Sequence, residues 1–141
     1  VYSLLYGLVH YNVEIYLVSP PSLRIRQESI YGLTEKLKIS ELTELDDEVL
    51  SKIDVLYVTR IQRERFPDIQ EYEKVKGTYI IDSNVLNRLK SDASIMHPMP
   101  RVDEISKNID LTKNAIYFKQ VAYGKELRAA LLALVLNESG L

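Results

Sequence analysis

The sequence contains no cysteine, which excludes disulfides, thiol nucleophiles and every zinc or iron site that needs cysteine ligands. Histidine is also scarce, because His10 and His97 are the only two in the chain. Two imidazoles are too few for a histidine-rich metal site. We therefore expect no bound metal.

Long apolar runs are absent as well. The longest lies near residues 129–136, far short of the roughly 20 apolar residues that a membrane-spanning helix needs. No charged leader precedes an apolar segment at the start of the sequence. We expect a cytoplasmic protein with no membrane partner.

The chain has no strong excess of charge of one sign. Its net charge is −2 at pH 7, so it lacks the basic field that nonspecific nucleic-acid binding requires, and any anion must be held locally. It also has no glycine-rich phosphate loop, serine nucleophile elbow or paired carboxylates at catalytic spacing. These absences argue against nucleic-acid binding, hydrolases and ordinary Rossmann dehydrogenases.

What is present indicates one folded domain. The 141 residues, 46% of them apolar, are enough for a real core. We predict strands at 13–18, 38–39, 54–59 and 94–96. We predict helices at 1–8, 22–33, 46–53, 82–89, 103–105 and about 115–137, the last interrupted near Gly124. Because strands and helices alternate, the expected fold is a three-layer α/β/α domain with a mostly parallel, Rossmann-like sheet.

The stretch from Asp54 to Arg65 changes abruptly from a buried strand to dense charge. Its strand would end at the carboxyl edge of the sheet, where ligands bind in open α/β folds. Arg60 offers a planar fork of donors that matches a carboxylate or phosphate, and Gln62 adds a directional donor beside it. The alternative is a solvated turn in which these arginines and Glu64 form weak salt bridges, and composition alone favours that alternative.

The strand at 94–96 ends in a similar way, in the sequence His97-Pro98-Met99-Pro100-Arg101. Two prolines that flank one residue fix the direction of its carbonyl, which can then accept from an amine or amide with little ordering cost. The alternative is a rigid turn that only redirects the chain. We expect the two loops to bring together Arg60, Gln62, His97 and Arg101 as a site for an anion.

The chain breaks again at Phe66-Pro67-Asp68, after the arginine cluster. The next segment, Gln70–Lys76, is polar and charged, with only Tyr72 and Val75 to anchor it. A weakly anchored segment beside an expected binding site is a candidate mobile loop.

Two of these motifs carry a resemblance to a known family. Asp54–Arg65 and His97–Ile105 together closely resemble the second domain of the aspartate carbamoyltransferases. Val1-Tyr2-Ser3-Leu4 resembles the helix after that domain's first strand, and the stretch from Tyr117 to Leu136 resembles its closing helix. The resemblance covers essentially the whole chain, and two such motifs at this separation are specific.

The resemblance implies transfer of a carbamoyl group from carbamoyl phosphate to the α-amino group of L-aspartate, the committed step toward pyrimidines. It implies no metal, no cofactor and no covalent intermediate. Arg60 and Gln62 would hold an aspartate carboxylate. A related ornithine enzyme must recognise a cationic side chain, which Arg60 would repel.

By the same resemblance, the backbone at Pro98, Met99 and Pro100 would meet the amino and carbamoyl groups, while His97 supports that loop. Four further residues fall in the segment that moves on domain closure, namely Glu64, Arg65, Glu71 and Tyr72.

Several parts of the family's site are not in this sequence. The domain's first strand, a further arginine just before the position of Val1, and the N-terminal carbamoyl phosphate domain are missing. We therefore expect residues 1–141 to be the aspartate-binding half, to contain no catalytic residue and to be inactive alone. The implied partners are L-aspartate, carbamoyl phosphate, the N-terminal domain and a homotrimer of catalytic chains; the binding of regulatory chains is left open.

Two other readings of the sequence stay open. One is a carbamoyltransferase for another amino acid, against which Arg60 and Gln62 already argue. The other is a non-enzymatic ligand-binding or interaction module on the same fold.

Overall fold

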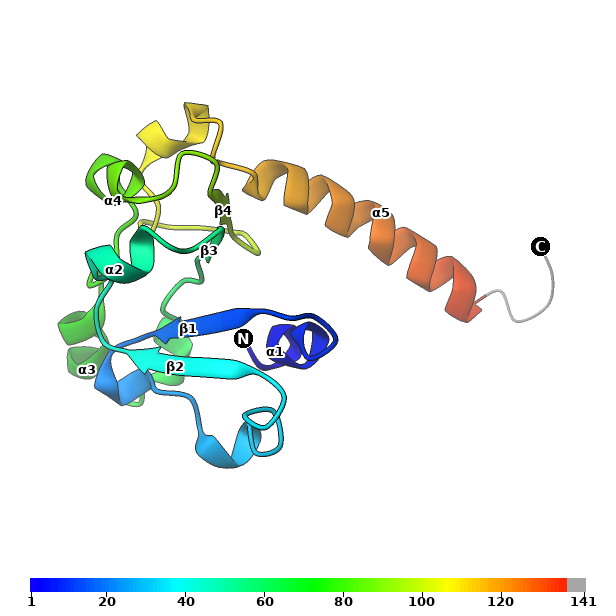
Figure 1. The fold of residues 1–141 in the computed structure, drawn as a ribbon, viewed down its shortest axis with the longest axis horizontal. Helices are drawn as coiled ribbons and strands as arrows, with labels where there is room; N and C mark the ends of the chain where they lie inside the picture. Colours follow the sequence, from blue (N-terminus) through cyan, green and yellow to red (C-terminus); the bar gives the residue numbers. More distant parts are fainter. Residues whose placement is uncertain (137–141) are drawn as a thin grey trace. The chain divides into compact units, whose positions relative to one another are not determined.

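The computed structural model describes residues 1–136, except for the side chain of Arg65 (Figure 1). The chain divides into two compact units, Val1–Val49 and Leu50–Leu141. Each unit is built around one pair of parallel strands.

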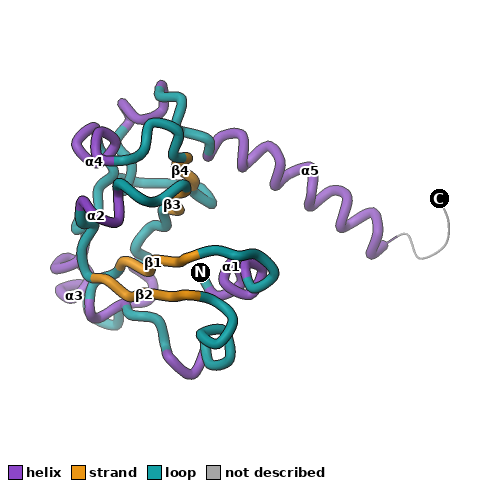
Figure 2. The backbone as a smooth tube through the Cα atoms, viewed as in Figure 1, coloured by secondary structure: helices purple, strands orange, loops and turns teal. Residues whose placement is uncertain are grey.

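The first unit contains helix α1 (Tyr2–Leu8) and strands β1 (Glu14–Val18) and β2 (Lys38–Leu42). The two strands pair in parallel (Figure 2), with Glu14 opposite Lys38. The predicted helix at 1–8 and strand at 13–18 are confirmed, and the predicted strand at 38–39 extends further. The core contains Leu5, Ile30 and Leu33, with Tyr2, Val9, Ile15, Leu17 and Ile25 packed against it.

The predicted helix at 22–33 is wrong. Only two short 3₁₀ turns form there, η1 (Pro21–Leu23) and η2 (Gln27–Ser29), because the intervening backbone is extended, with ψ of 150° at Arg24 and 121° at Arg26. The segment reaches the core instead through Ile30, after which Gly32 adopts a left-handed φ of 81° that suits glycine.

The second unit contains strands β3 (Val55–Tyr57) and β4 (Ser94–Met96), which also pair in parallel. Helix α4 (Ser83–Arg88) precedes β4 and is capped by the Asp82 carboxylate, which accepts from the backbone N–H groups of Asn84 and Val85. Short helix α2 (Asp47–Leu50), which includes the boundary between the two units, precedes β3. These three elements, α2, α4 and β4, lie within the ranges predicted for them.

The candidate mobile loop at 70–76 is not a loop, because helix α3 (Ile69–Val75) forms there. Asp68 caps it, accepting from the Gln70 N–H at 2.8 Å, and none of its residues is buried. The helix is set by its cap and by residues with good helix propensity, rather than by an apolar face. Whether this segment moves stays a prediction.

The helix predicted at 103–105 is also wrong. Glu104 and Ile105 turn inward, and Ile105 forms a parallel bridge with Ile81, which uses the backbone groups a helix would need. The helical turn lies further on, as 3₁₀ helix η4 (Lys107–Leu111), and it buries Ile109.

Helix α5 (Tyr117–Leu136) is 20 residues long and continuous through Gly124, so the predicted interruption is wrong. One glycine costs a helix only about 1 kcal/mol, too little to break it. Tyr117 is fully buried, but six apolar residues of the later turns are exposed, namely Leu127, Leu131, Leu132, Leu134, Val135 and Leu136. The predicted end at Asn137 lies outside the described residues. Among residues 1–136, no helix has the length and apolar character to cross a membrane.

The predicted α/β class with parallel strands is confirmed. "Rossmann-like" is an approximate description, because the assigned strands form a pair in each unit (Figure 2). In the second unit, the bridge between Ile95 and Ala115 continues the parallel pairing beyond β4.

Candidate functional site

Two predicted loops, the arginine loop (residues 59–65) and the proline loop (residues 97–101), leave the same edge of the second unit's sheet. Strands β3 and β4 are parallel, and the Val58 N–H donates to the Met96 carbonyl at 2.9 Å, so both strands end side by side. Arg60 follows β3 by three positions, and His97 directly follows β4. The sheet therefore supports the predicted convergence of the arginine and proline loops.

Arg60 forms an ion pair in this structure. Its Nη2 donates to Glu64 Oε1 at 2.7 Å, and the side chains are 40% and 57% exposed. The solvated salt bridge foreseen as the alternative is thus present. An exposed pair of this kind is worth only about 0–1 kcal/mol, so a ligand carboxylate can replace Glu64 on the guanidinium at little cost. Gln62 is half-buried and immediately precedes 3₁₀ helix η3 (Arg63–Arg65).

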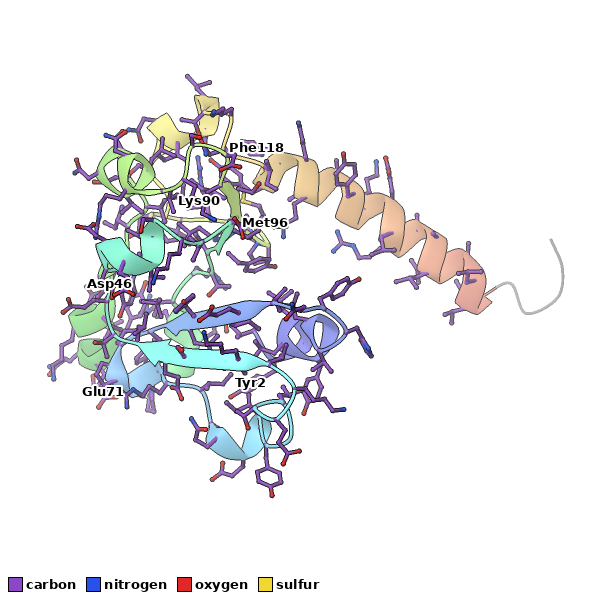
Figure 3. All side chains as sticks on the ribbon, in the orientation of Figure 1. Tyr2, Asp46, Glu71, Lys90, Met96 and Phe118 are labelled. Carbon is purple, nitrogen blue, oxygen red and sulfur yellow. The ribbon has the colours of Figure 1, made fainter. Side chains whose placement is uncertain are left out.

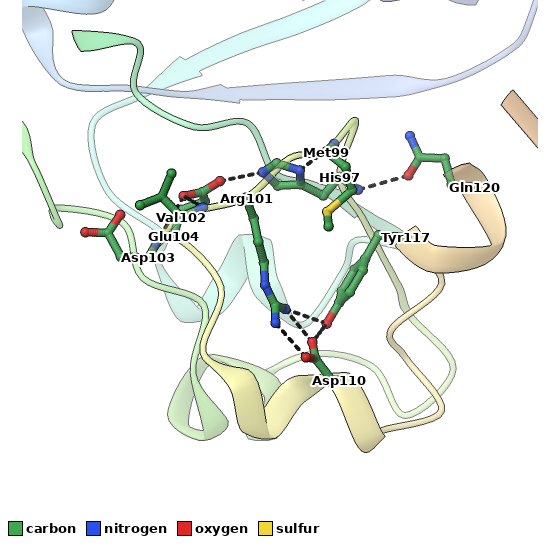
Figure 4. Close-up of polar contacts among 9 residues, drawn as sticks. All are labelled: His97, Met99, Arg101, Val102, Asp103, Glu104, Asp110, Tyr117 and Gln120. Carbon is green, nitrogen blue, oxygen red and sulfur yellow. Dashed lines mark hydrogen bonds and ion pairs between the residues drawn. The ribbon is translucent and has the colours of Figure 1, made fainter. Parts of the chain in front are cut away.

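His97 lies inside the proline loop, with only 1% of its surface exposed. Its Nδ1 accepts from the Met99 N–H at 2.8 Å, and its Nε2 is 2.7 Å from Glu104 Oε1 (Figure 4). Its backbone N–H donates to Gln120 Oε1 at 2.9 Å. Both ring nitrogens are therefore occupied within the chain. These contacts agree with the expectation that His97 supports the loop, and its place among the substrate-binding residues stays a prediction.

The loop that His97 supports presents its outer side to solvent. Pro98 and Pro100 are exposed, whereas Met99 is half-buried. Met99 has a left-handed φ of 53°, which is uncommon for a residue with a side chain. The hydrogen bond from its N–H to His97 holds it there. The loop is thus held from the inside by His97, while Pro98 and Pro100 face solvent.

Arg101, which we expected to bind an anionic ligand, is paired with a carboxylate of the chain itself. Both terminal nitrogens of its guanidinium donate to the Asp110 carboxylate, one of them at 2.5 Å, and Nη1 also reaches the Tyr117 hydroxyl at 3.1 Å (Figure 4). The guanidinium holds the pKa of Asp110 below its ordinary value. Burial, together with the hydrogen bond to Asp110, raises the pKa of Tyr117 to about 12. Arg101 therefore anchors the loop to α5 and η4.

Glu104 is a functional candidate that the sequence did not single out. It is 8% exposed, and its Oε2 accepts from the backbone N–H groups of Val102 and Asp103, each at 3.1 Å. Burial alone would raise the pKa of this carboxyl, but the backbone hydrogen bonds and His97 outweigh it, so the pKa lies below its ordinary value. No spacing rule marks Glu104, because its partners follow from how the loop folds.

An open hollow of about 550 Å³ lies beside the proline loop. The loop residues Pro98, Met99 and Pro100 line one part of it, and α5 lines another with residues that include Gln120 and Arg128. Most of its lining is apolar, and Gln120 and Arg128 supply the polar side chains. Within residues 1–136, no group of three or more histidine, aspartate or glutamate side chains is placed to hold a metal ion.

The predicted closure residues lie on both sides of the break at Pro67. Glu71 lies in the first turn of α3 (Figure 3), and the Tyr72 ring stands edge-on to Phe66 at 5.7 Å between centroids. Glu64 is the partner of Arg60. The side chain of Arg65 lies outside the described residues.

Residues 1–135 match the family model of the aspartate/ornithine carbamoyltransferase Asp/Orn-binding domain. The chain is 56% identical over 140 residues to the aspartate carbamoyltransferase catalytic subunit of Nitrosopumilus maritimus, and 50% identical over 141 residues to that of Thermococcus kodakarensis. In both cases the match covers 99% of this chain and 45% of the relative. The chain thus spans less than half the length of the curated relatives it matches.

The chain is also similar to solved structures of aspartate transcarbamoylases. The catalytic subunit of M. jannaschii aspartate transcarbamoylase superposes with a TM-score of 0.81 at 46% identity, covering 99% of this chain and 46% of that one. Aspartate transcarbamoylase from Trypanosoma cruzi, in complex with carbamoyl phosphate and aspartate, superposes with a TM-score of 0.84 at 34% identity, covering 93% of this chain and 44% of that one.

Proposed function

Since the chain belongs to the aspartate/ornithine carbamoyltransferase family as its Asp/Orn-binding domain, we propose that it is the L-aspartate-binding half of an aspartate carbamoyltransferase. The complete protein transfers a carbamoyl group from carbamoyl phosphate to L-aspartate, giving N-carbamoyl-L-aspartate and phosphate in pyrimidine biosynthesis. The observation that carries this proposal is the arginine loop beside the proline loop at one sheet edge. Residues 1–141 act together as one aspartate-binding domain.

In this proposal, Arg60 and Gln62 hold a carboxylate of L-aspartate. In the free chain the exposed Glu64 carboxylate forms an ion pair with the Arg60 guanidinium, and the substrate carboxylate replaces Glu64 there. A positively charged ornithine side chain would gain nothing from Arg60. The pair therefore favours aspartate over ornithine as the second substrate.

The proline loop orients the reacting groups. Carbonyls at Pro98, Met99 and Pro100 accept hydrogen bonds from the α-amino group and from the carbamoyl N–H₂. The neutral amine attacks the carbonyl carbon of carbamoyl phosphate, the bond from that carbon to the phosphate oxygen breaks, and the ammonium proton of the adduct is lost. Two anions must be held close against their repulsion, so positioning and charge neutralisation carry most of the rate.

The carbamoyl phosphate site lies in the N-terminal half of the complete protein. The exposed apolar residues of α5 fit this proposal, because an apolar surface of this extent on one helix favours burial against another domain. A homotrimer of catalytic chains completes the assembly. The cytoplasmic location stays a prediction.

A carbamoyl-transfer assay tests the proposal, on this chain and on the full-length protein, with L-aspartate and L-ornithine offered separately. We expect activity with aspartate alone and only in the full-length protein. Activity of the 141-residue chain would contradict its role as one half. No activity in either form would favour the binding-module alternative.

The role of Arg60 has its own test in the full-length enzyme. Arg60→Ala removes a charged hydrogen-bonding partner from aspartate only, so we expect the aspartate KM to rise by about tenfold to a hundredfold while the carbamoyl phosphate KM stays unchanged. Arg63→Ala, at an exposed position nearby, is the matched control. An unchanged aspartate KM in Arg60→Ala would refute the assignment.

A further inference from the structure

We propose that Glu104 is a positioning residue for the proposed reaction, which acts through His97 to hold the Pro98–Pro100 loop in its substrate-binding conformation. This proposal rests on the proposed function. It adds a residue that touches no substrate and sets the geometry of the backbone that does.

A single buried carboxylate joins the two ends of this loop. One oxygen of Glu104 lies 2.7 Å from His97 Nε2, at the beginning of the loop. The other accepts from the backbone N–H groups of Val102 and Asp103, at its end (Figure 4). Glu104 is 8% exposed and His97 is 1% exposed, so little water competes for these bonds.

The arrangement requires one tautomer of His97. The Met99 N–H donates to Nδ1, and only a ring nitrogen without hydrogen can accept. The proton of the neutral ring is therefore on Nε2, where it donates to Glu104. An ionised carboxylate only accepts, so Glu104 selects the tautomer that Met99 needs.

The tautomer in turn sets the outer face of the loop. Met99 has a left-handed φ of 53°, a region that is sterically unfavourable for a residue with a side chain. The bond to His97 stabilises that conformation, which fixes the direction of the carbonyls on either side of Met99. If His97 carried its proton on Nδ1, two N–H groups would face each other and Met99 would lose its partner.

The test compares wild type with Glu104→Gln in the full-length enzyme. The amide keeps the size of the side chain but cannot accept at both of its ends, so either His97 or the Val102 and Asp103 N–H groups lose a partner. We expect the aspartate KM to rise about tenfold, the loss typical of a charged hydrogen bond, with the carbamoyl phosphate KM unchanged. Glu44→Gln, at an exposed carboxylate, is the matched control and should leave both constants unchanged.

Nitrogen-15 NMR of the histidine rings supplies a readout that does not depend on activity. His97 signals are assigned as those missing from His97→Gln, and the exposed His10 serves as an internal reference. We expect wild-type His97 to show a proton on Nε2 and none on Nδ1 at neutral pH. This measurement needs no variant at Glu104, so it holds even if Glu104→Gln fails to fold.

The outcomes separate the two proposals. Wild-type His97 with its proton on Nδ1, or Glu104→Gln with an unchanged aspartate KM, overturns the role of Glu104 while leaving the proposed function intact. A full-length wild type that does not carbamoylate aspartate overturns the proposed function itself. The expected tautomer together with a selective rise in the aspartate KM supports both.

Discussion

At the scale of single residues, Arg101 shows why a charged residue in a binding motif need not bind the ligand. Both terminal nitrogens of its guanidinium bond to Asp110, one of them also to the Tyr117 hydroxyl, and its side chain is only 13% exposed. An arginine engaged in this way contributes rigidity to the loop that starts at His97. It leaves the recognition of a carboxylate to Arg60.

Replacing Arg101 by lysine should therefore cost stability more than affinity. Lysine keeps the charge but cannot make two parallel hydrogen bonds to one carboxylate. We expect Arg101→Lys to lower the free energy of unfolding by about 2 kcal/mol, measured by urea denaturation. Arg63→Lys, at an exposed position, should change it by less than about 0.5 kcal/mol. Equal effects of the two substitutions would show that the Asp110 pair contributes nothing.

The same pair predicts a dependence on pH. Arg101 lowers the pKa of Asp110 in the folded chain, and the unfolded value is about 3.9. A lowered folded pKa gives stability that is complete above the unfolded value and is lost as the pH falls through the folded one. We expect wild type to exceed Asp110→Asn in unfolding free energy by a constant margin above about pH 5, and the margin to shrink below about pH 4. A margin that stays constant down to about pH 3 would contradict this origin.

The sequence indicates the charged residues of the arginine loop, but it does not reveal the carboxylates that stabilise the proline loop. Arg60 and its neighbour Glu64 were both named in advance, and their ion pair was foreseen as the alternative. Glu104 and Asp110 were missed because their partners lie seven and nine residues away across irregular backbone. Helices and strands give periodic spacings that a sequence reveals, and irregular loops do not.

At the scale of elements, Gly124 lowers the stability of helix α5, and a substitution there can raise it. It lies in the continuous helix α5, and a Cβ built there meets nothing closer than the end of the Arg128 side chain at 4.0 Å. We expect Gly124→Ala to raise the free energy of unfolding by about 0.4–1 kcal/mol, because alanine loses less backbone entropy on folding. Gly32→Ala should lower it, since Gly32 has a left-handed φ of 81°. Thermal or urea unfolding of the two variants checks both signs.

The capping residue Asp82 gives a second prediction for an element. Its carboxylate accepts from the N–H groups of Asn84 and Val85, at 2.9 and 3.0 Å, at the start of α4. Asp82→Ala should lower the free energy of unfolding, and Asp82→Asn or Asp82→Ser should recover most of the loss. If the alanine variant were as stable as wild type, the cap would not contribute to stability.

The errors in predicting elements have two physical causes. In the segment 22–33, apolar residues suggested a helix, but turns and extended backbone bring Ile30 and Leu33 into the core and pack Ile25 against it. In the segment 69–75, we overlooked a helix because it has no buried face, although Asp68 and the residues after it carry a recognisable cap and good helix propensity. The first helix was absent for tertiary reasons, whereas local signals could have revealed the second.

At the scale of the whole molecule, the most conspicuous feature is the apolar surface of α5. Leu131 is 51% exposed and Leu134 is 75% exposed, among several neighbours on the same helix. We expect the 141-residue chain to enhance the fluorescence of an apolar dye, and Leu131→Lys with Leu134→Lys to remove at least about half of that signal. Leu111→Lys, at an isolated exposed leucine on η4, is the control and should leave the signal unchanged. No loss in the double variant would mean that this surface is not what binds the dye.

The class of the molecule was predictable because alternation of strands and helices is a property of the whole sequence. Parallel pairing followed from it and is observed in both units. The division into two compact units was not predictable, because no linker, repeat or change of composition marks the boundary near Val49. It follows from which side chains pack together in three dimensions.

Gln120 connects α5 to the ends of strands β3 and β4. Its amide accepts from the His97 N–H at 2.9 Å and reaches the Tyr57 hydroxyl at 3.4 Å, so the helix is tied to the ends of both β3 and β4 at its fourth residue. From there to Leu136 the helix extends about 24 Å, while the amide stands roughly 5 Å from the helix axis. Tilting the helix by about 6° about this point moves the far end by about 2.5 Å and the amide by about half an ångström. A displacement of a few ångströms at the far end of α5 would therefore shift the Gln120 amide beside the proline loop by only about half an ångström.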